Sequence, residues 1–395
     1  METLQTSQQT VHASQQTNGL PKVTIQAVTS KKQLAQFIDF PHDLYRNDVN
    51  YVPELFIAQR DLLTPGKHPF HEHSALQTFL AFRGNEIVGR IAAIDNKNAN
   101  VFNKTNDGFF GFFDCINDKE VSQALFNAAR QWLKERKLGT MIGPVNFSTN
   151  EACGLLVEGF DGPPVVMMTY NYPYYVKLIE EAGFATKITM YAWKIIPQYM
   201  NDRPFRVMEV LQERIMTRRN ITFRKVNMKN FEQEVKGIHA IYNSAWDKNL
   251  GFVPMTEAEF MYLAKDLKMI LDPDFGIVAE ENGKLVGFAL AIPDINQVLI
   301  KIKRGRLFPT GIVKLLLGKK KVNGLRILAL GVLESHRKLG IDACFYGELM
   351  KVGRAKGVAY GEGSWILETN EMMNAAMRGI NADRYRTYRI YEKEI

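Results

Sequence analysis

The sequence predicts an α/β protein with a mixed sheet (α+β), built as two tandem copies of one unit. Strand-like and helix-like segments alternate along the chain, and their order returns about 200 residues later. In the second copy, a buried strand, a glycine-containing turn and an amphipathic helix follow one another between Arg326 and Ala355. A chain of 395 residues is long enough for two domains that each bury a core.

Each element is predicted from a local pattern. Short apolar runs between turn residues indicate strands, and apolar residues at three- and four-residue spacing indicate helices. The first copy is expected to contain strand Val23–Ala27, helix Lys31–Tyr45, hairpin strands Thr78–Phe82 and Ile87–Ile94, strand Phe109–Cys115, helix Val121–Lys137, strand Met141–Phe147, helix Tyr174–Ala182 and strand Thr186–Ile195. The second is expected to contain strand Ile221–Val226, helix Phe231–Trp246, hairpin strands Ile277–Glu280 and Leu285–Ile292, strand Ile327–Leu333, a helix ending at Ala355, strand Trp365–Glu368 and a terminal strand near Thr387–Tyr391.

The repeat is visible in short matched stretches. Ile87-Val88-Gly89 matches Leu285-Val286-Gly287, and Ser148–Glu151 matches Glu368–Glu371, with an offset that grows by about twenty residues between the two matches. We therefore expect extra residues in the second copy. The predicted organisation is a disordered tail over 1–21, a first domain over 22–197, a linker from Pro197 to Pro204, and a second domain over 205–395 with an insertion at about 296–325.

The insertion carries the positive charge of the chain. The net charge is +8, and between Ile295 and Leu333 there are nine basic residues and no acidic one. Interleaved with apolar residues, such a run predicts peripheral contact with an anionic membrane surface. A solvated surface insertion is the alternative. Nucleic acid is a disfavoured partner, because Phe308 is the only aromatic residue among these cations.

Cysteine usage and hydropathy indicate the compartment. The three cysteines are far apart and show neither disulfide nor zinc-ligand spacing, so we expect a reducing compartment and no metal. The sequence shows no apolar run of membrane-spanning length and no signal-peptide pattern. We expect a cytoplasmic protein, associated with the inner face of the membrane if the insertion docks there.

The turn before the predicted helix of the second copy has the physical features of a phosphate site. A helix N-terminus offers unpaired N–H groups and partial positive charge, Arg337 and Lys338 add charge, and Gly340 permits close approach of the backbone. The stretch Arg337–Ala343 resembles the acyl-CoA pyrophosphate loop of the GNAT N-acyltransferase superfamily, Arg/Gln-x-x-Gly-x-Gly/Ala. It departs from that pattern at Asp342, where a second small residue is expected.

The resemblance covers about residues 22–395 and implies two tandem GNAT-like domains that use acyl-CoA or acetyl-CoA as co-substrate. It implies that pantetheine lies between two splayed strands, against backbone groups of Gly331, Val332 and Leu333. It also implies pyrophosphate contacts from Arg337, Lys338, Gly340 and Ile341, and a position near the thiol for Asn370. The first copy has no Arg-x-x-Gly loop between Phe113 and Gln123, although Asn171–Phe184 resembles a later family helix. One acyl-CoA site, in the second domain, is therefore expected.

Four further stretches, Lys67–Phe70, Pro144–Glu151, Gly251–Pro254 and Pro293–Gln297, resemble the GNAT-type bacterial ceramide synthases, which N-acylate a long-chain amine. The implied activity is transfer of an acyl group to an amine, and the implied acceptor is a small-molecule or lipid amine. The alternative is a catalytically inactive tandem module that binds lipid or protein.

Acyl transfer to an amine needs a base near the acceptor. Glu334 and Glu368 are the candidates, because each ends one of two strands expected to be neighbours; each also suits the cap of the following helix. Tyr174 and Tyr175 are candidates to reach across from the first domain and protonate the leaving thiolate, with half-buried packing as the alternative.

Overall fold

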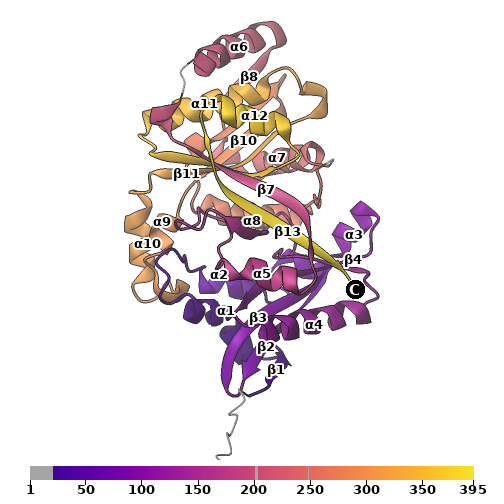
Figure 1. Cartoon of the computed structure of the whole chain (residues 1–395). Coiled ribbons are helices and arrows are strands. Elements are labelled where there is room, and N and C mark those ends of the chain that lie inside the picture. The colour runs from indigo at the N-terminus through magenta and orange to yellow at the C-terminus, as the bar shows by residue number, and fades with distance from the viewer. Residues whose placement is uncertain (1–20, 201–202, 248) are drawn as a thin grey trace, which may run out of the picture.

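The computed structural model describes residues 21–200, 203–247 and 249–395. The predicted tail over 1–21 lies outside this part of the chain, apart from its last residue. Figure 1 shows two halves stacked one above the other, with the first half at the bottom and most of the second at the top. Of the described helices, none has both the length and the apolar character needed to cross a bilayer.

The first half follows the predicted order of elements. The capping box of Ser30 with Gln33 starts its first helix, and Asp118 caps its longest one. The strand predicted over 141–147 stops at Gly143, because the following Pro144 has no N–H for a sheet bond. The elements are β1 (Val23–Ala27), α1 (Lys31–Leu44), α2 (Phe56–Leu62), β2 (Ala75–Arg83), β3 (Glu86–Asp95), α3 (Lys97–Asn103), β4 (Asp107–Cys115), α4 (Lys119–Glu135), β5 (Thr140–Gly143), β6 (Leu155–Glu158), α5 (Tyr174–Glu181) and β7 (Ala185–Ile195).

The second half repeats this order and adds the insertion between its third and fourth strands. The elements are α6 (Arg203–Arg219), β8 (Ile221–Lys225), α7 (Phe231–Ala245), α8 (Glu257–Lys268), β9 (Gly276–Glu281), β10 (Lys284–Pro293), α9 (Asn296–Leu299), α10 (Gly311–Lys319), β11 (Gly324–Val332), α11 (Ile341–Ala355), β12 (Tyr360–Leu367), α12 (Glu371–Gly379) and β13 (Asp383–Glu394). The insertion forms α9 and α10. The predicted mixed α/β fold is confirmed.

The predicted linker from Pro197 to Pro204 is wrong at its end, because α6 begins at Arg203. This helix packs against α11, where Gln212 donates to Glu348 across 3.0 Å. The helix forms here because Leu211 and Ile215 pack into the hydrophobic core of the second half. Figure 1 shows α6 above α11 at the upper end of the molecule.

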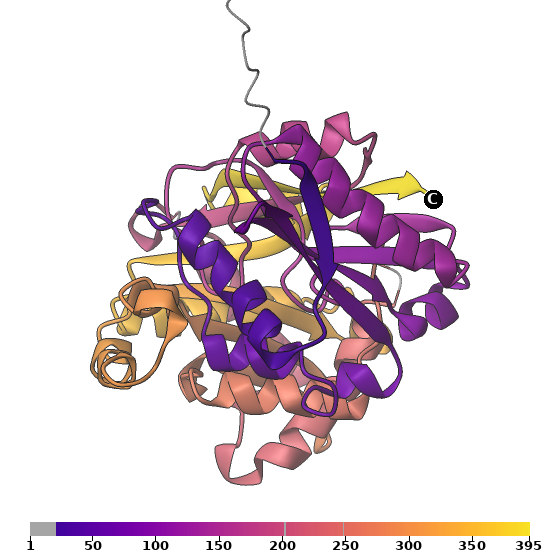
Figure 2. The same ribbon diagram turned by 90° about the horizontal axis from the view of Figure 1, so that it is seen from below.

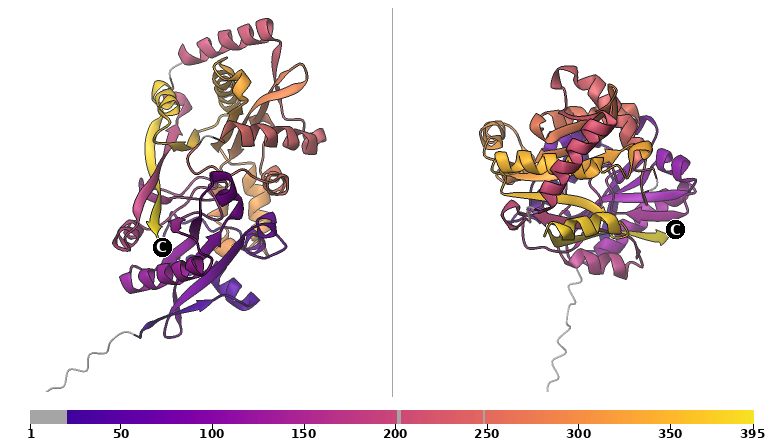
Figure 3. Two further views of the ribbon diagram at one scale, coloured as in Figure 1. Left: turned by 90° about the vertical axis from the view of Figure 1, so that its right-hand side faces the viewer. Right: turned by 90° about the horizontal axis from the view of Figure 1, so that it is seen from above.

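A single thirteen-stranded sheet runs through both halves in the order β1-β2-β3-β4-β5-β13-β7-β12-β11-β10-β9-β8, with β6 beside β13. The terminal strands cross between the halves: β13, from the second, pairs with β5 and β7 of the first, and β7 pairs with β12. Figure 3 (left) shows β13 as the yellow ribbon that descends into the first half. This exchange fixes the two halves to each other through continuous backbone hydrogen bonding.

Two pairs of parallel strands in this sheet separate partway along their length. β11 and β12 are paired only from Gly324 with Tyr360 to Ile327 with Gly363. β4 and β5 are paired only from Asp107 with Thr140 to Phe109 with Ile142. Beyond these pairs each half has a gap in the sheet whose strand edges carry backbone groups without a strand partner.

Candidate active site

A mainly apolar cavity of about 210 Å³ adjoins the gap between β11 and β12. The second half supplies aliphatic and aromatic side chains from α7, α8, β10, β11 and β12. The first half supplies a loop after β5 and two residues of β7. The lining residues are Thr149, Asn150, Glu151, Cys153, Met167, Ile188, Met190, Ile238, Tyr242, Trp246, Asn249, Leu250, Phe252, Phe260, Leu263, Leu267, Phe288, Leu290, Arg326, Leu328, Ala329, Ser364, Trp365 and Leu367.

Glu151 is the one carboxylate among these lining residues, and it comes from the first half. Removal from water, together with the nearby negative charges of Glu259 and Asp266, raises its pKa to about 8. The carboxyl is therefore divided between its acid and its ionised form near neutral pH. A carboxyl with this property can both take and return a proton.

The loop that carries Glu151 is attached to the second half. Asn150 donates from Nδ2 to the carbonyl of Val253 (2.8 Å) and accepts at Oδ1 from the hydroxyl of Tyr242 (2.6 Å). The hydroxyl of Thr149 donates to the carbonyl of Gly251 (2.8 Å). These bonds hold Glu151 at the cavity wall, so the site is composed of both halves.

Arg326 forms a buried cationic part of the wall, with an exposed fraction of 1%. Its guanidinium donates to Oγ of Ser364 (3.0 Å) and to the carbonyl of Val166 (3.1 Å), and it lies 4.8 Å from the centre of the Trp365 ring. Burial lowers its pKa, and the negative charge of Glu362 opposes that shift. Arg326 thus ties β11 to β12 at the point where the strands separate.

The predicted pyrophosphate loop contains two residues in the left-handed region. Lys338 (φ 66°) and Gly340 (φ 87°) are both left-handed, and Gly340 is the N-cap of the fifteen-residue helix α11. Such a turn presents successive N–H groups to one side, as anion-binding loops do. Lys338 is exposed, whereas Ile341 is buried in the core. Asp342 stands in the first turn of α11, as its position in the sequence implies.

Arg337 has a different partner from the one expected. Its guanidinium donates to the carbonyl of Ala245 (3.1 Å) at the end of α7. The loop is therefore attached to the helix that lines the cavity. This bond uses one nitrogen of the guanidinium, and the predicted pyrophosphate contact of Arg337 stays a prediction.

Two of the three predicted pantetheine contacts on β11 need correction. The N–H of Leu333 donates to the carbonyl of Val286 (2.9 Å) on β10. Successive residues of a strand direct their backbone groups to opposite sides, so Gly331, opposite Phe288, also faces β10. Val332 and Leu330 face the gap. Hydrogen bonding of pantetheine to the backbone of Val332 stays a prediction. The backbone groups of Leu330 point to the same side and are a second candidate for such a contact.

The predicted bases lie at the ends of neighbouring strands as expected, but neither is among the residues that line the cavity. Glu334 is exposed and accepts the N–H of Arg337 through its carbonyl. Glu368 is exposed and accepts from the hydroxyl of Tyr191. Asn370 caps α12 by accepting from the N–H of Met373 (3.2 Å). Glu151 is the residue that the sequence reasoning missed.

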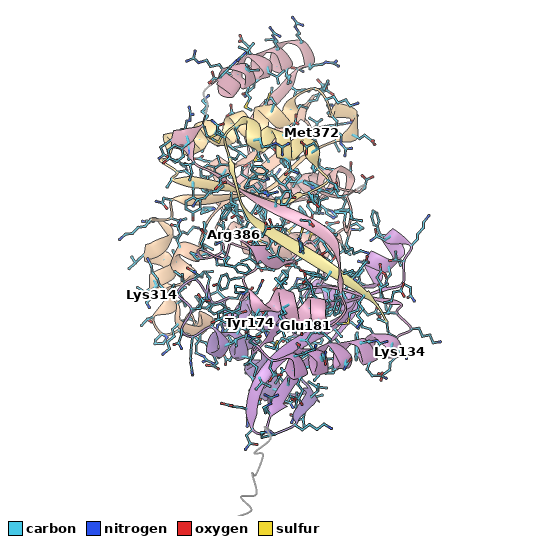
Figure 4. All side chains as sticks on the ribbon, in the orientation of Figure 1. Lys134, Tyr174, Glu181, Lys314, Met372 and Arg386 are labelled. Carbon is cyan, nitrogen blue, oxygen red and sulfur yellow. The ribbon has the colours of Figure 1, made fainter. Side chains whose placement is uncertain are left out.

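The expectation that Tyr174 and Tyr175 reach the second half has to be corrected. The hydroxyl of Tyr175 accepts from the N–H of Cys115 (3.0 Å), and that of Tyr174 donates to the carbonyl of Cys115 (2.7 Å). Figure 4 labels Tyr174 on α5 in the first half. These tyrosines therefore provide hydrogen-bond partners for backbone groups of β4 beyond its pairing with β5. This part of the first half corresponds to the gap beside β11 in the second.

A second, more polar cavity of about 170 Å³ lies at that gap in the first half, and Met167 lines both cavities. Arg90 and Asp114 form a buried ion pair there (2.8 Å). Burial lowers the pKa of His42 in its wall to about 3, so this imidazole is neutral. Among the residues that the structure describes, no group of three or more His, Cys, Asp and Glu side chains is placed to hold a metal ion.

Two curated proteins match almost the whole chain. Protein YghO of Escherichia coli (strain K12) is 36% identical over 380 residues, which is 94% of this chain and 95% of that protein. The bacterial ceramide synthase of Caulobacter vibrioides (strain NA1000 / CB15N) is 35% identical over 377 residues, or 93% and 96%. No protein-family model matches the chain.

Two solved structures share the fold at low sequence identity. A tandem GNAT protein from the clavulanic acid biosynthesis pathway has a TM-score of 0.56 at 10% identity and covers 94% of this chain and 98% of its own. A GCN5-related N-acetyltransferase from Sphaerobacter thermophilus has a TM-score of 0.51 at 12% identity, with 95% and 97% covered. The tandem arrangement predicted from the internal repeat is confirmed.

Proposed function

The chain belongs to the tandem GNAT family that includes the bacterial ceramide synthase of Caulobacter vibrioides, and from this we propose that it is an acyl-CoA-dependent N-acyltransferase whose acceptor is a long-chain amine. The observation that carries the proposal is the apolar cavity at the gap between β11 and β12, with the carboxyl of Glu151 in its wall. Acyl-CoA is the co-substrate, and no metal takes part in the proposed reaction.

The shape of the site supports this assignment of substrates. The N-terminus of α11, with Gly340, is suited to the pyrophosphate of CoA. From there the gap beside Val332 leads toward the cavity, so a pantetheine arm can follow the free strand edge. An apolar cavity of about 150 Å³ holds a benzene molecule, and a cavity of 210 Å³ therefore accommodates the reacting groups with several carbons of an alkyl chain.

In the proposed reaction the amine nitrogen attacks the thioester carbonyl carbon, the C–N bond forms, the C–S bond breaks, and CoA leaves as a thiolate. Glu151 takes the proton that the nitrogen loses. Its raised pKa allows it to pass that proton on to the departing thiolate, so the products are an amide and free CoA thiol. The apolar wall excludes water, which limits hydrolysis of the thioester.

The acceptor assignment rests on the relative and on the cavity. The relative is named a ceramide synthase, and a ceramide is the amide of a fatty acid with a long-chain amino alcohol. Side chains such as Leu263, Leu267 and Leu328 offer such a chain an apolar surface. A polar acceptor such as an aminoglycoside would leave its hydroxyl groups without partners on this wall.

The test is direct. The purified protein is incubated with acetyl-CoA or palmitoyl-CoA and with either a long-chain 2-amino alcohol or ethanolamine, which has the same reacting group without the chain. Release of CoA thiol is followed with a thiol reagent, and the amide is identified by mass spectrometry. The proposal expects amide only with the long-chain acceptor. Equal turnover of ethanolamine would refute the acceptor class, and no thiol release with any amine would favour the inactive-module alternative.

A further inference from the structure

Helix α10 presents an apolar face to solvent. Val313, Leu316 and Leu317 are 53%, 64% and 68% exposed, and Phe308 just before the helix is 79% exposed. Residues at i, i+3 and i+4 of a helix share one face, so these three side chains form one stripe. Figure 2 shows the insertion, in orange, projecting from the side of the molecule.

This exposed stripe is additional to a face of α10 that is already packed. Gly318 lies so close to α9 that a Cβ there would be 2.7 Å from Val298. Leu315 points inward and joins the hydrophobic cluster that also contains Leu267 and Met190 of the active-site cavity. The helix is thus held firmly, and its outer apolar residues have no core left to fill.

The cations of the insertion differ in their partners. Arg306 pairs with Asp39 of α1 (2.8 Å), and Arg304 pairs with Asp43 of the same helix, so these two attach the insertion to the first half. Lys303, Lys320 and Lys321 are exposed and form no ion pair within the part of the chain that the structure describes. Lys320 lies one turn beyond Leu316 and Leu317 on the same side of the helix. Figure 4 labels Lys314 on this outer edge of the molecule.

We propose that this surface, made of Phe308, Val313, Leu316 and Leu317 with Lys320 and Lys321, docks on an anionic lipid bilayer. Apolar side chains on one face with lysines at its border are typical of a helix that lies in the plane of the lipid headgroups. The lysines supply charge complementarity, at roughly 1 kcal/mol each near an anionic leaflet. Docking would present a lipid-borne amine to the protein; this last step rests on the proposed function, whereas docking itself does not.

Docking is tested by co-sedimentation of the full chain with vesicles of phosphatidylglycerol mixed with phosphatidylcholine, and with vesicles of phosphatidylcholine alone, without acyl-CoA or amine. The anionic vesicles are expected to bind the protein at low salt. Raising the ionic strength from about 0.1 M to about 1 M shortens the Debye length from roughly 10 Å to roughly 3 Å, and binding is expected to fall with it. Equal binding to both kinds of vesicle overturns the proposal.

Two pairs of variants separate the apolar and ionic contributions. Leu316→Ser with Leu317→Ser is expected to lower the partition coefficient roughly tenfold or more. Val101→Ser with Val207→Ser, which removes exposed valines (79% and 61%) from α3 and α6, is expected to leave it unchanged. Lys320→Ser with Lys321→Ser is expected to weaken binding several-fold at low salt only. Lys134→Ser with Lys265→Ser keeps the same net charge as that variant and binds as the unchanged protein does.

The alternative to a lipid bilayer is that a second copy of the chain covers this surface in a dimer. Light scattering distinguishes it: a dimer that becomes a 45.1 kDa monomer on Leu316→Ser with Leu317→Ser, combined with no vesicle binding, overturns the lipid assignment. Retained vesicle binding by that variant, with circular dichroism unchanged, also overturns it. Because no substrate is present, failure here is independent of the acyltransferase test.

Discussion

Replacing Glu151 by Gln is expected to separate activity from stability, and the expected sizes follow from its environment. The pKa of the carboxyl is about 8 in the folded protein and about 4.5 in the unfolded chain. A raised pKa favours folding below 4.5, and that contribution is lost as the pH rises toward 8. At about 1.4 kcal/mol for each pH unit, the loss approaches roughly 5 kcal/mol. Because the Glu151 side chain is partly exposed to solvent, we expect a loss of about 2–3 kcal/mol.

Glutamine is uncharged at every pH and avoids this loss. Glu151→Gln should therefore unfold at a higher denaturant concentration than the unchanged protein at pH 8, and at about the same concentration at pH 5. Its turnover should fall roughly 10²–10⁴-fold, because the base is missing, with the affinity for CoA retained. In the unchanged protein, kcat/KM should rise with pH through an inflection near 8, since the ionised carboxyl is the active base.

The measurements are chemical unfolding at the two pH values, thiol release from pH 6 to 9, and calorimetry with CoA. Asn150→Asp tests the attachment of the loop instead: it removes the Nδ2 donor to the carbonyl of Val253 and adds a negative charge next to Glu151, so both stability and turnover should fall. Full turnover of Glu151→Gln across the pH range would refute the role of the carboxyl, whatever its stability does. A lower stability of Glu151→Gln than of the unchanged protein at pH 8 would refute the claim that the ionised Glu151 destabilises the folded state.

Three further outcomes are expected. Gly340→Ala should weaken CoA binding by a few kcal/mol in calorimetry, because a Cβ there would lie 2.6 Å from the Leu211 side chain of α6 and displace the loop backbone. Gly357→Ala, also at positive φ but with open space around it, should bind CoA normally, and equal effects would indicate backbone strain alone. Glu334→Gln and Glu368→Gln should each keep turnover within about twofold of the unchanged protein, since neither residue lines the cavity. A hundredfold loss of turnover in one of these variants would indicate that the replaced glutamate is the base. Tyr175→Phe should lower the free energy of unfolding by about 1–3 kcal/mol, because it leaves a buried N–H unpaired, and should not change CoA affinity; a change in that affinity would place Tyr175 in the active site.

Much of the site could be expected from local sequence. The loop from Arg337 to Ile341 was recognisable because a helix start, a left-handed glycine and flanking cations are properties of consecutive residues. The basic insertion was equally visible, since its length and charge are read directly from the chain. The sequence does not show distant partners: it places Arg337 in the predicted pyrophosphate loop, but the carbonyl that its guanidinium contacts belongs to α7.

Glu151 shows why the carboxylate of the candidate site was missed. Its neighbours in sequence are polar loop residues, and nothing in Ser148–Glu151 distinguishes a cavity wall from a solvated turn. Its raised pKa depends on burial against the second half and on Glu259, more than a hundred residues away. Glu334 and Glu368 were favoured because they end strands, a local criterion that does not report which side chains enter the cavity.

The sequence by itself determined that one fold is present twice, that the second copy has an Arg-x-x-Gly turn before a helix, and that a basic segment without acidic residues is inserted into that copy. Periodicity, turn chemistry and charge are properties of neighbouring residues. Only the tertiary structure decided that β13 enters the first half, that Glu151 and Arg326 share one cavity, and that Arg304 and Arg306 are used to attach the insertion while Leu316 and Leu317 stay exposed. These features arise from contacts between distant residues, whose free energies depend on burial and on the partner that each group meets after folding.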